Sequence, residues 1–287
     1  MGAFDRVFDH LVYVKEKKTG TGVIEIHIAN GSKNFTEFLV HSGTPFPLSD
    51  PDTGYFLCAA AKNNEYDLIY IKTKSTGTGK IELHRLSAAS GYKGFTKQLG
   101  TAFDVSEGNN GTFLFYGGLL YFVKYRNTGS GKVELHRCGY RDDSYSKVDI
   151  SWVTGFSPDE ASHGTWCMGG LTGGAESLHL IKTSNTGSGK IEIHTWSGPR
   201  SGISIEETGF NIGEGWNGTF HMGSHSELYF VKSANMGSGK IEVHCCNALG
   251  DFPWSKRYQN IDHRVSAYPG SDAAEGKFLI VKSTSRA

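Results

Sequence analysis

The sequence predicts an all-β fold, and three observations support that class. One phrase of ten residues, with a Glu and a His in every copy, occurs five times along the 287 residues. An apolar run ending in Lys precedes each copy, and glycine is abundant (38 residues) whereas proline is scarce (7). The five copies are KTGTGVIEIH (18–27), STGTGKIELH (75–84), NTGSGKVELH (127–136), NTGSGKIEIH (185–194) and NMGSGKIEVH (235–244). Apolar runs joined by glycine-rich turns are typical of short strands in hairpins.

Each repeat contains four predicted strands, and the second repeat shows them in order. The first strand is GYFLCAAA (54–61), and the second is DLIYIKT (67–73). The segment KSTGTG then supplies a tight hairpin turn, because glycine adopts positive φ without strain. The third strand, KIELHRL (80–86), alternates, so its Glu and His share one face. FTKQLGTAF (95–103) is the fourth strand.

The ends of the chain indicate how the repeats are arranged. They recur about every 50–60 residues, a period at which propellers and solenoids place several strands in each unit. The last first-strand sequence, GKF (276–278), is followed only by the end of the chain. The N-terminal repeat, in contrast, begins at a second strand, LVYVK (11–15). We therefore predict a five-bladed β-propeller of four-stranded antiparallel blades, closed by a C-terminal strand that completes the N-terminal blade.

Six blades are the alternative, in which GAF (2–4) is a first strand and FLIVK opens a further blade. With five blades, residues 1–287 form a single β-propeller domain. The repeats then span approximately 11–53 plus 276–287, 54–110, 111–163, 164–217 and 218–275.

The repeated phrase, preceded by sequences such as LYFVK and followed by LSAASGYKGFTKQLGTAF (86–103), resembles the β-propeller repeats of bacterial and fungal lectins. It is loosely similar to FG-GAP-type repeats as well. The resemblance implies a carbohydrate-binding function with glycans or glycoconjugates as partners. Many FG-GAP relatives carry an aspartate-rich calcium loop, but segments such as SDPDTG (49–54) and SEGNNG (106–111) lack its alternating acids. We expect no bound metal and no cofactor.

Composition and hydropathy restrict the classes of partner and the cellular location that the sequence predicts. Basic and acidic residues balance at 29 each, which argues against nucleic acid as a partner. No apolar run approaches the roughly 20 residues of a membrane span, so we expect no membrane insertion. The N-terminus lacks the apolar stretch of a signal peptide, which predicts a protein that is cytoplasmic or released without a classical signal peptide. Five cysteines without metal-site spacing are expected to be free, and homo-oligomer formation is left open.

The recurring Glu and His have two interpretations. An acid beside an imidazole is typical of acid–base or ligand-binding chemistry. Five copies without a recurring nucleophile instead favour a scaffold, in which the preceding Lys, across the hairpin, helps to neutralise a partly buried polar face. Ligand contact in the clefts between blades remains an alternative, so the pairs are kept as candidate carbohydrate-binding residues: Glu82 and His84, Glu134 and His136, Glu192 and His194, and Glu242 and His244.

The segments that vary between repeats offer the other candidates for sugar binding. A pyranose needs an aromatic ring for its C–H face, and amides, imidazoles or carboxylates for its hydroxyls. Residues of these types stand before first strands, at the end of a third strand or in an outer loop. They are Trp216, Asn217, Asn109, Asn110, His163, Trp196 and Trp254.

The leading functional hypothesis is a lectin with up to five individually weak sites, whose combined engagement gives avidity. A protein–protein interaction propeller is the runner-up. An enzyme, such as a hydrolase or lyase acting at the central channel, is the third hypothesis and is not favoured. Its candidate residues would be Asp159, His163, His221 and His225.

Overall fold

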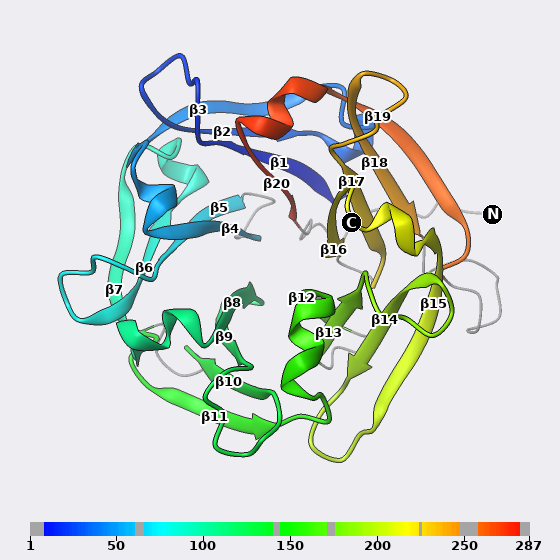
Figure 1. Cartoon of the computed structure of the whole chain (residues 1–287). Helices are drawn as coiled ribbons and strands as arrows, with labels where there is room; N and C mark the ends of the chain where they lie inside the picture. The colour runs from blue at the N-terminus through cyan, green and yellow to red at the C-terminus, as the bar shows by residue number, and fades with distance from the viewer. Residues whose placement is uncertain are drawn as a thin grey trace, which may run out of the picture.

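A computed structural model describes residues 9–60, 66–139, 144–170, 176–223, 226–246 and 258–281 of the chain. Five four-stranded antiparallel sheets surround a central opening (Figure 1), which confirms the predicted five-bladed β-propeller. The helical elements of the described residues are short 3-10 turns between strands. None of the helices in these ranges is long and apolar enough to cross a lipid bilayer.

The strands of every blade follow the same order, from the innermost to the outermost. Blade 1 contains β20 (Gly276–Val281), β1 (His10–Lys15), β2 (Val23–Ala29) and β3 (Phe38–Pro47). Blade 2 contains β4 (Gly54–Ala60), β5 (Tyr66–Lys72), β6 (Lys80–Leu86) and β7 (Phe95–Asp104). Blade 3 contains β8 (Gly111–Tyr116), β9 (Leu119–Lys124), β10 (Glu134–Cys138) and β11 (Val148–Val153). Blade 4 contains β12 (Gly164–Gly170), β13 (Glu176–Lys182), β14 (Lys190–Trp196) and β15 (Ile203–Asn211). Blade 5 contains β16 (Gly218–Met222), β17 (Leu228–Lys232), β18 (Lys240–Cys246) and β19 (Ile261–Pro269).

The ring closes in blade 1, where the first and last strands of the described chain pair with each other. Strand β20 pairs antiparallel with β1, with Leu11 opposite Ile280 and Tyr13 opposite Phe278. The rings of Tyr13 and Phe278 stack at a centroid distance of 4.6 Å. The predicted closure is therefore confirmed, and the C-terminal apolar segment completes blade 1 instead of opening a sixth blade. The segment GAF (2–4) lies outside the described residues.

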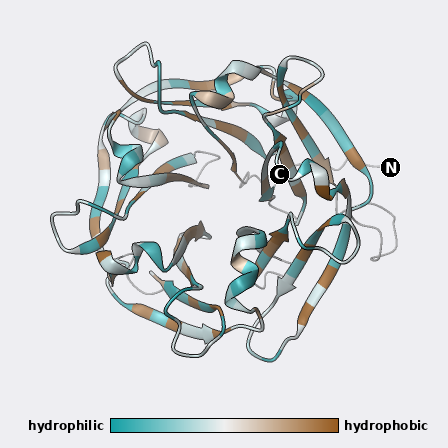
Figure 2. Cartoon of the chain, in the orientation of Figure 1, coloured by the Kyte–Doolittle hydropathy of each residue, from teal (hydrophilic) through white to brown (hydrophobic). Residues whose placement is uncertain are grey.

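The hydrophobic core is divided into clusters that lie between neighbouring blades. One cluster joins Ile26 and Phe46 of blade 1 to Phe56 and Tyr70 of blade 2. Because neighbours cover both faces of a blade, its middle strands are buried almost throughout, and β5 is buried from Tyr66 to Ile71. The outermost strands are partly exposed to water, and Figure 2 shows them as alternating teal and brown segments.

A glycine begins the innermost strand of every blade because the adjacent strand leaves no room for a side chain. A Cβ atom added at Gly218 would lie 2.0 Å from the carbonyl oxygen of Val231 on β17. The equivalent glycines, where the added atom would lie 2.1 or 2.2 Å from a carbonyl oxygen, are Gly54, Gly111, Gly164 and Gly276. This close approach explains why all five first-strand sequences begin with glycine.

We expect Gly218→Ala to lower the free energy of unfolding by about 2–3 kcal/mol, because the new methyl group meets backbone that cannot move without distorting the blade. Gly237→Ala is the control, since a Cβ atom there would have no neighbour within 4 Å. Urea denaturation measures both variants. Equal unfolding midpoints for the two would contradict the steric explanation.

Candidate functional site

The Glu of each repeated phrase closes the hairpin between the second and third strands of its blade. In blade 4, Glu192 Oε1 accepts hydrogen bonds from the Ser188 hydroxyl at 2.8 Å and from the Ser188 backbone N–H at 3.2 Å. The same two bonds link Thr21 to Glu25, Thr78 to Glu82, Ser130 to Glu134 and Ser238 to Glu242. The hairpin turn keeps a Ser or Thr because the largely buried carboxylate needs these donors.

The second carboxylate oxygen faces the His two residues further along the strand. The distance from Glu Oε2 to His Nε2 is 2.9 Å in Glu192–His194. It is 3.2 to 3.5 Å in the pairs Glu25–His27, Glu82–His84, Glu134–His136 and Glu242–His244. Burial acts to raise the pKa of Glu192, but hydrogen bonds from His194 and Ser188 outweigh it and lower the pKa below its usual value. The ionised carboxylate is thus a fixed part of the hairpin, which supports the scaffold interpretation.

The Lys that ends the second strand has partners other than those expected in two blades. Lys15 lies opposite Glu25 in the strand register, but its ammonium group pairs with Glu275 at 3.2 Å. Lys124 likewise pairs with Glu107 at 3.1 Å. Both acids belong to turns that precede an innermost strand. In blades 1 and 3 the Lys therefore ties the hairpin to the turn between blades, where the sequence had predicted a Lys–Glu–His cluster.

We expect Glu192→Gln to lower the free energy of unfolding by about 1–3 kcal/mol, because it removes charge-assisted hydrogen bonds at a buried position. Glu207→Gln is the matched control, because Glu207 is exposed and lies opposite Glu192 on β15. That control should change stability by less than about 0.5 kcal/mol. Urea unfolding monitored by tryptophan fluorescence compares the two variants. A similar loss in both would assign the effect to net charge and not to the hairpin.

Five 3-10 turns connect the blades, and Figure 1 shows them around the central opening. The turns are η2 (Asp50–Asp52), η5 (Val105–Asn109), η6 (Pro158–His163), η7 (Ile212–Glu214) and η9 (Gly270–Ala274). The Asn217 carbonyl accepts backbone hydrogen bonds from Ser233 at 2.7 Å and Ala234 at 2.9 Å. Thr53, Asn110, His163 and Glu275 accept equivalent pairs in the other blades. The exposed residues one position earlier are Asp52, Asn109, Ser162, Trp216 and Ala274.

Three of the sequence-predicted residues in these turns are held by neighbouring polar groups. Asn217 Oδ1 accepts a hydrogen bond from the Asn235 side chain at 2.7 Å. Asn110 Oδ1 accepts one from Asn127 at 2.8 Å. His163 is half-buried, with Nδ1 3.2 Å from the Ser184 hydroxyl. These side chains therefore fix the turns, and the residue preceding each of them faces the solvent.

The predicted tryptophans occupy different environments. Trp216 is 82% exposed, more than any other large apolar residue among those described. Trp196 is buried at the end of β14 and packs edge-on against Trp152, at a centroid distance of 6.0 Å. Trp254 lies outside the described residues. The predicted residues thus divide between turns, hairpins and core, and they do not converge on one site. Trp216 with Asn217 is the place where an exposed ring adjoins an amide.

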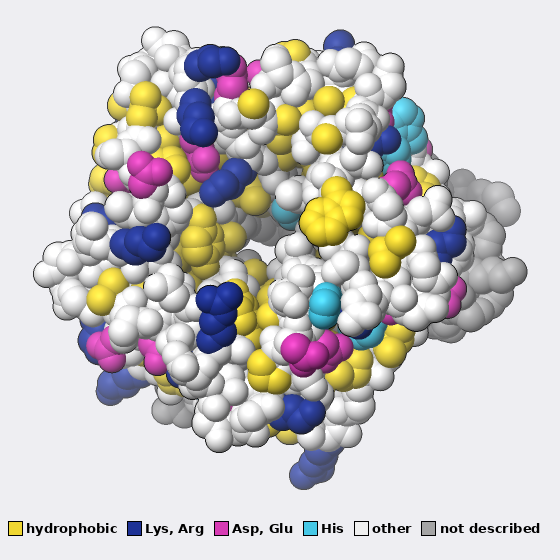
Figure 3. Space-filling view, in the orientation of Figure 1, with side chains coloured by type: hydrophobic (Ala, Val, Ile, Leu, Met, Phe, Trp, Pro, Cys, Tyr) yellow, Lys and Arg dark blue, Asp and Glu magenta, His cyan; other side chains and the backbone are white. Residues whose placement is uncertain are grey.

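A cavity of about 680 Å³ lies among the innermost strands, with residues from all five blades in its lining. Figure 3 shows the opening at the centre of the ring, edged by yellow hydrophobic side chains. Aromatic rings such as Tyr55, Phe113, Trp166 and Phe220 form much of the wall, and the volume is typical of small-molecule sites. The sequence did not identify these residues, because the alternation of a first strand does not show which face meets the channel.

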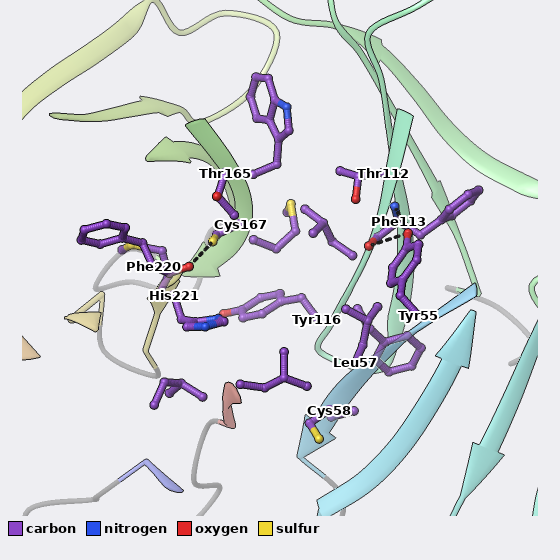
Figure 4. A pocket seen from close by; sticks show the side chains of 18 of the residues that line it. Tyr55, Leu57, Cys58, Thr112, Phe113, Tyr116, Thr165, Cys167, Phe220 and His221 are labelled. Atoms are coloured by element: carbon purple, nitrogen blue, oxygen red, sulfur yellow. Dashed lines mark hydrogen bonds between the residues drawn. The ribbon is translucent and has the colours of Figure 1, made fainter. Parts of the chain in front are cut away.

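The described lining of the cavity combines apolar side chains with a few titratable groups. The described lining residues include His221 but no Asp or Glu. Figure 4 shows His221 and Tyr116 pointing toward one another across the cavity. The His221 Nε2 atom lies 3.0 Å from the Thr219 hydroxyl. Burial raises the pKa of the Cys58 thiol far above its usual range, so this thiol does not supply a thiolate at neutral pH.

We expect His221 to make the protein less stable in acid. Burial lowers its pKa from 6.5 to about 4, partly offset by a hydrogen bond with the Phe278 backbone. Between these values the unfolded chain binds the proton and the folded chain does not, so stability falls as the pH falls. Wild type should lose about 1–2 kcal/mol more than His221→Gln between about pH 7 and pH 4.5. Urea denaturation at both pH values measures this difference, and parallel losses in the two proteins would refute it.

Two groups of described side chains have the composition of a metal site. One contains Glu25, His27 and His41, and the other contains Glu242, His244 and His263. The sequence analysis missed His41 and His263, because these residues lie in fourth strands, outside the repeated phrase. They can be identified only from the strand register, which places His41 opposite His27 and His263 opposite His244.

Comparisons with known proteins add little to this description. No protein-family model matches the chain. No curated protein matches it either. A solved crystal structure of a protein from Lactobacillus plantarum aligns with a TM-score of 0.35 and 9% identity, over 90% of this chain and 66% of that chain. A similarity at this level carries no functional argument. The chain is a five-bladed β-propeller, an architecture that fits a binding or protein-interaction role.

Proposed function

We propose that this propeller is a carbohydrate-binding protein, a lectin whose principal site is centred on Trp216. The observation that carries the proposal is the exposure of that indole ring, at 82%. A large aromatic side chain left in water is unusual in a protein whose other described tryptophans are at least partly buried. Stacking against the C–H face of a pyranose would remove this apolar surface from water.

The turn that carries Trp216 is held in place before any ligand binds. The Asn211 backbone N–H donates to Glu214 Oε2 at 3.2 Å, at the start of η7. The Gly215 backbone N–H donates to the Ile212 carbonyl at 3.1 Å, and the Asn217 carbonyl accepts two further backbone bonds. A rigid turn loses little conformational entropy when a ligand binds, which favours affinity even for a small contact area.

Asn217 directly follows Trp216, and its amide Nδ2 can donate to a sugar hydroxyl while its Oδ1 accepts from Asn235. Equivalent positions in the other turns hold Asp52, Asn109, Ser162 and Ala274. The five sites are therefore unequal, with one aromatic platform and several weaker polar ones that contribute through avidity. In this proposal the buried Glu–His pairs hold the hairpins and do not contact the sugar.

A protein-interaction propeller is the second candidate function, and a different observation favours it. The outermost strands expose apolar side chains, including Leu39 (51%), Val153 (54%) and Ile205 (59%). These strands are also sheet edges, which can pair with a partner strand. The exposed apolar residues are spread over several blades around the rim and do not form one site. Trp216, in contrast, lies at a single interblade turn.

A glycan array followed by calorimetric titration of the best hit tests the lectin proposal. We expect Trp216→Ala to weaken binding at least about tenfold, because the stacking surface is lost. Ile205→Ala removes another exposed apolar group, from the rim of the propeller, and should leave the affinity unchanged. Binding that survives Trp216→Ala would overturn the assignment of the site. A blank array across a broad library would favour the protein-interaction alternative, which capture of a defined partner would then establish.

A further inference from the structure

Two of the five Glu–His pairs have a second imidazole beside them. On β3, His41 lies opposite His27, and on β19, His263 lies opposite His244. In each group the two imidazoles and the carboxylate offer ligand atoms that all lie within 4.8 Å of one another. These groups are called here the blade 1 triad (Glu25, His27 and His41) and the blade 5 triad (Glu242, His244 and His263).

The blade 5 triad has the spacing of metal ligands. The Glu242 Oε2 atom lies 3.5 Å from His244 Nε2 and 3.5 Å from His263 Nε2. Tetrahedral ligands at about 2.0–2.1 Å from a zinc ion are separated by about 3.3–3.4 Å, so the side chains need to move only slightly. In the blade 1 triad, the Glu25 Oε2 and His27 Nε2 atoms are 3.3 Å apart.

An unsatisfied nitrogen supplies an independent observation. The His244 Nε2 atom is buried and makes no hydrogen bond among the described residues, although it lies 3.5 Å from Glu242 Oε2. A buried polar atom without a hydrogen bond is unfavourable. A bond from His244 Nε2 to a cation would give this buried nitrogen a partner.

We propose that the two triads bind divalent transition-metal ions, with Zn²⁺ as the reference ion. Two imidazoles and one carboxylate form a ligand set that zinc and other first-row metals accept. The His263 side chain is 48% exposed and His41 is also exposed, so solvent or a small ligand can reach the remaining coordination positions.

The hairpin already orients the carboxylate for this role. Glu242 Oε1 is held by the Ser238 hydroxyl at 2.8 Å and by the Ser238 backbone N–H at 3.2 Å. Only Oε2 is then directed at the imidazoles. Hydrogen bonds of this kind, which fix a ligand from behind, are typical of protein metal sites.

Blades 2, 3 and 4 contain the same Glu–His pair. They show which residues the scaffold accepts at the fourth-strand position opposite the His. The residue opposite His84 is Gln98, the one opposite His136 is Ser151, and the one opposite His194 is Ile205. Since a Gln, a Ser or an Ile is sufficient there for folding, the second imidazole in blades 1 and 5 is not needed by the scaffold. The proposal is independent of sugar binding, because neither triad includes Trp216 or its turn.

The test is calorimetric titration of full-length, untagged protein with ZnCl₂ after treatment with a chelator. We expect two sites per chain in wild type, one in His41→Gln, one in His263→Ser and none in the double variant. Both substitutions introduce a residue that another blade carries at the same position, and both positions are exposed, so folding should be unaffected. Circular dichroism and thermal melting without metal verify this.

Two further variants make the result specific to the triads. Gln98→Ser alters the matching position of blade 2 and should leave two sites. Ser151→His places an imidazole opposite His136 and should add a third site. A wild type that takes up no zinc would overturn the proposal. So would a double variant that still binds two ions, because the ligands would then lie elsewhere in the chain.

Discussion

Burial of both faces of every blade is the constraint on which the rest of the structure depends. A third strand between two neighbours cannot expose a polar face fully to water, so groups such as Glu192 must find partners inside their own hairpin. Ser188 supplies two donors from the turn, and His194 completes the set from the same strand. Because the same carboxylate is buried in each blade, every blade carries the same hairpin motif, a Ser or Thr in the turn followed by the Glu and His of the third strand. The repeated phrase therefore reflects the need of a buried carboxylate for hydrogen-bond partners.

The interblade turns vary more between blades than the residues that meet this requirement. The backbone of each interblade turn is fixed by main-chain hydrogen bonds, so the side chain two positions before the innermost strand can change without loss of the turn. That position holds an acid in Asp52, an aromatic ring in Trp216 and a methyl group in Ala274. Within these turns, the backbone groups that hold the turn are therefore distinct from the side chain that is exposed to solvent.

The same separation explains what the sequence could predict. Strand number, blade order and ring closure follow from periodic patterns and from the glycine before each first strand, and these features are confirmed. The site could not be predicted to the same extent, because it depends on direction and register. The sequence does not show that Trp196 is buried and Trp216 is exposed, although both are tryptophans near strand ends. Nor does it show that His263 lies opposite His244, which requires the pairing of β18 with β19 and the irregular register between them.

A buried carboxylate–imidazole pair is also a partly built metal site, because its desolvation and orientation are already supported by the fold. Adding one imidazole at an exposed strand position completes it without disturbing the core. Both triads lie at the ring junction, since blade 1 contains the first and last described strands, β1 and β20, and blade 5 precedes β20 in the chain. An ion bound there would link the third strand of a blade to its outermost strand. The binding free energy of the ion would then stabilise blades 1 and 5, whose separation opens the ring. Metal binding would in this way stabilise the closed propeller.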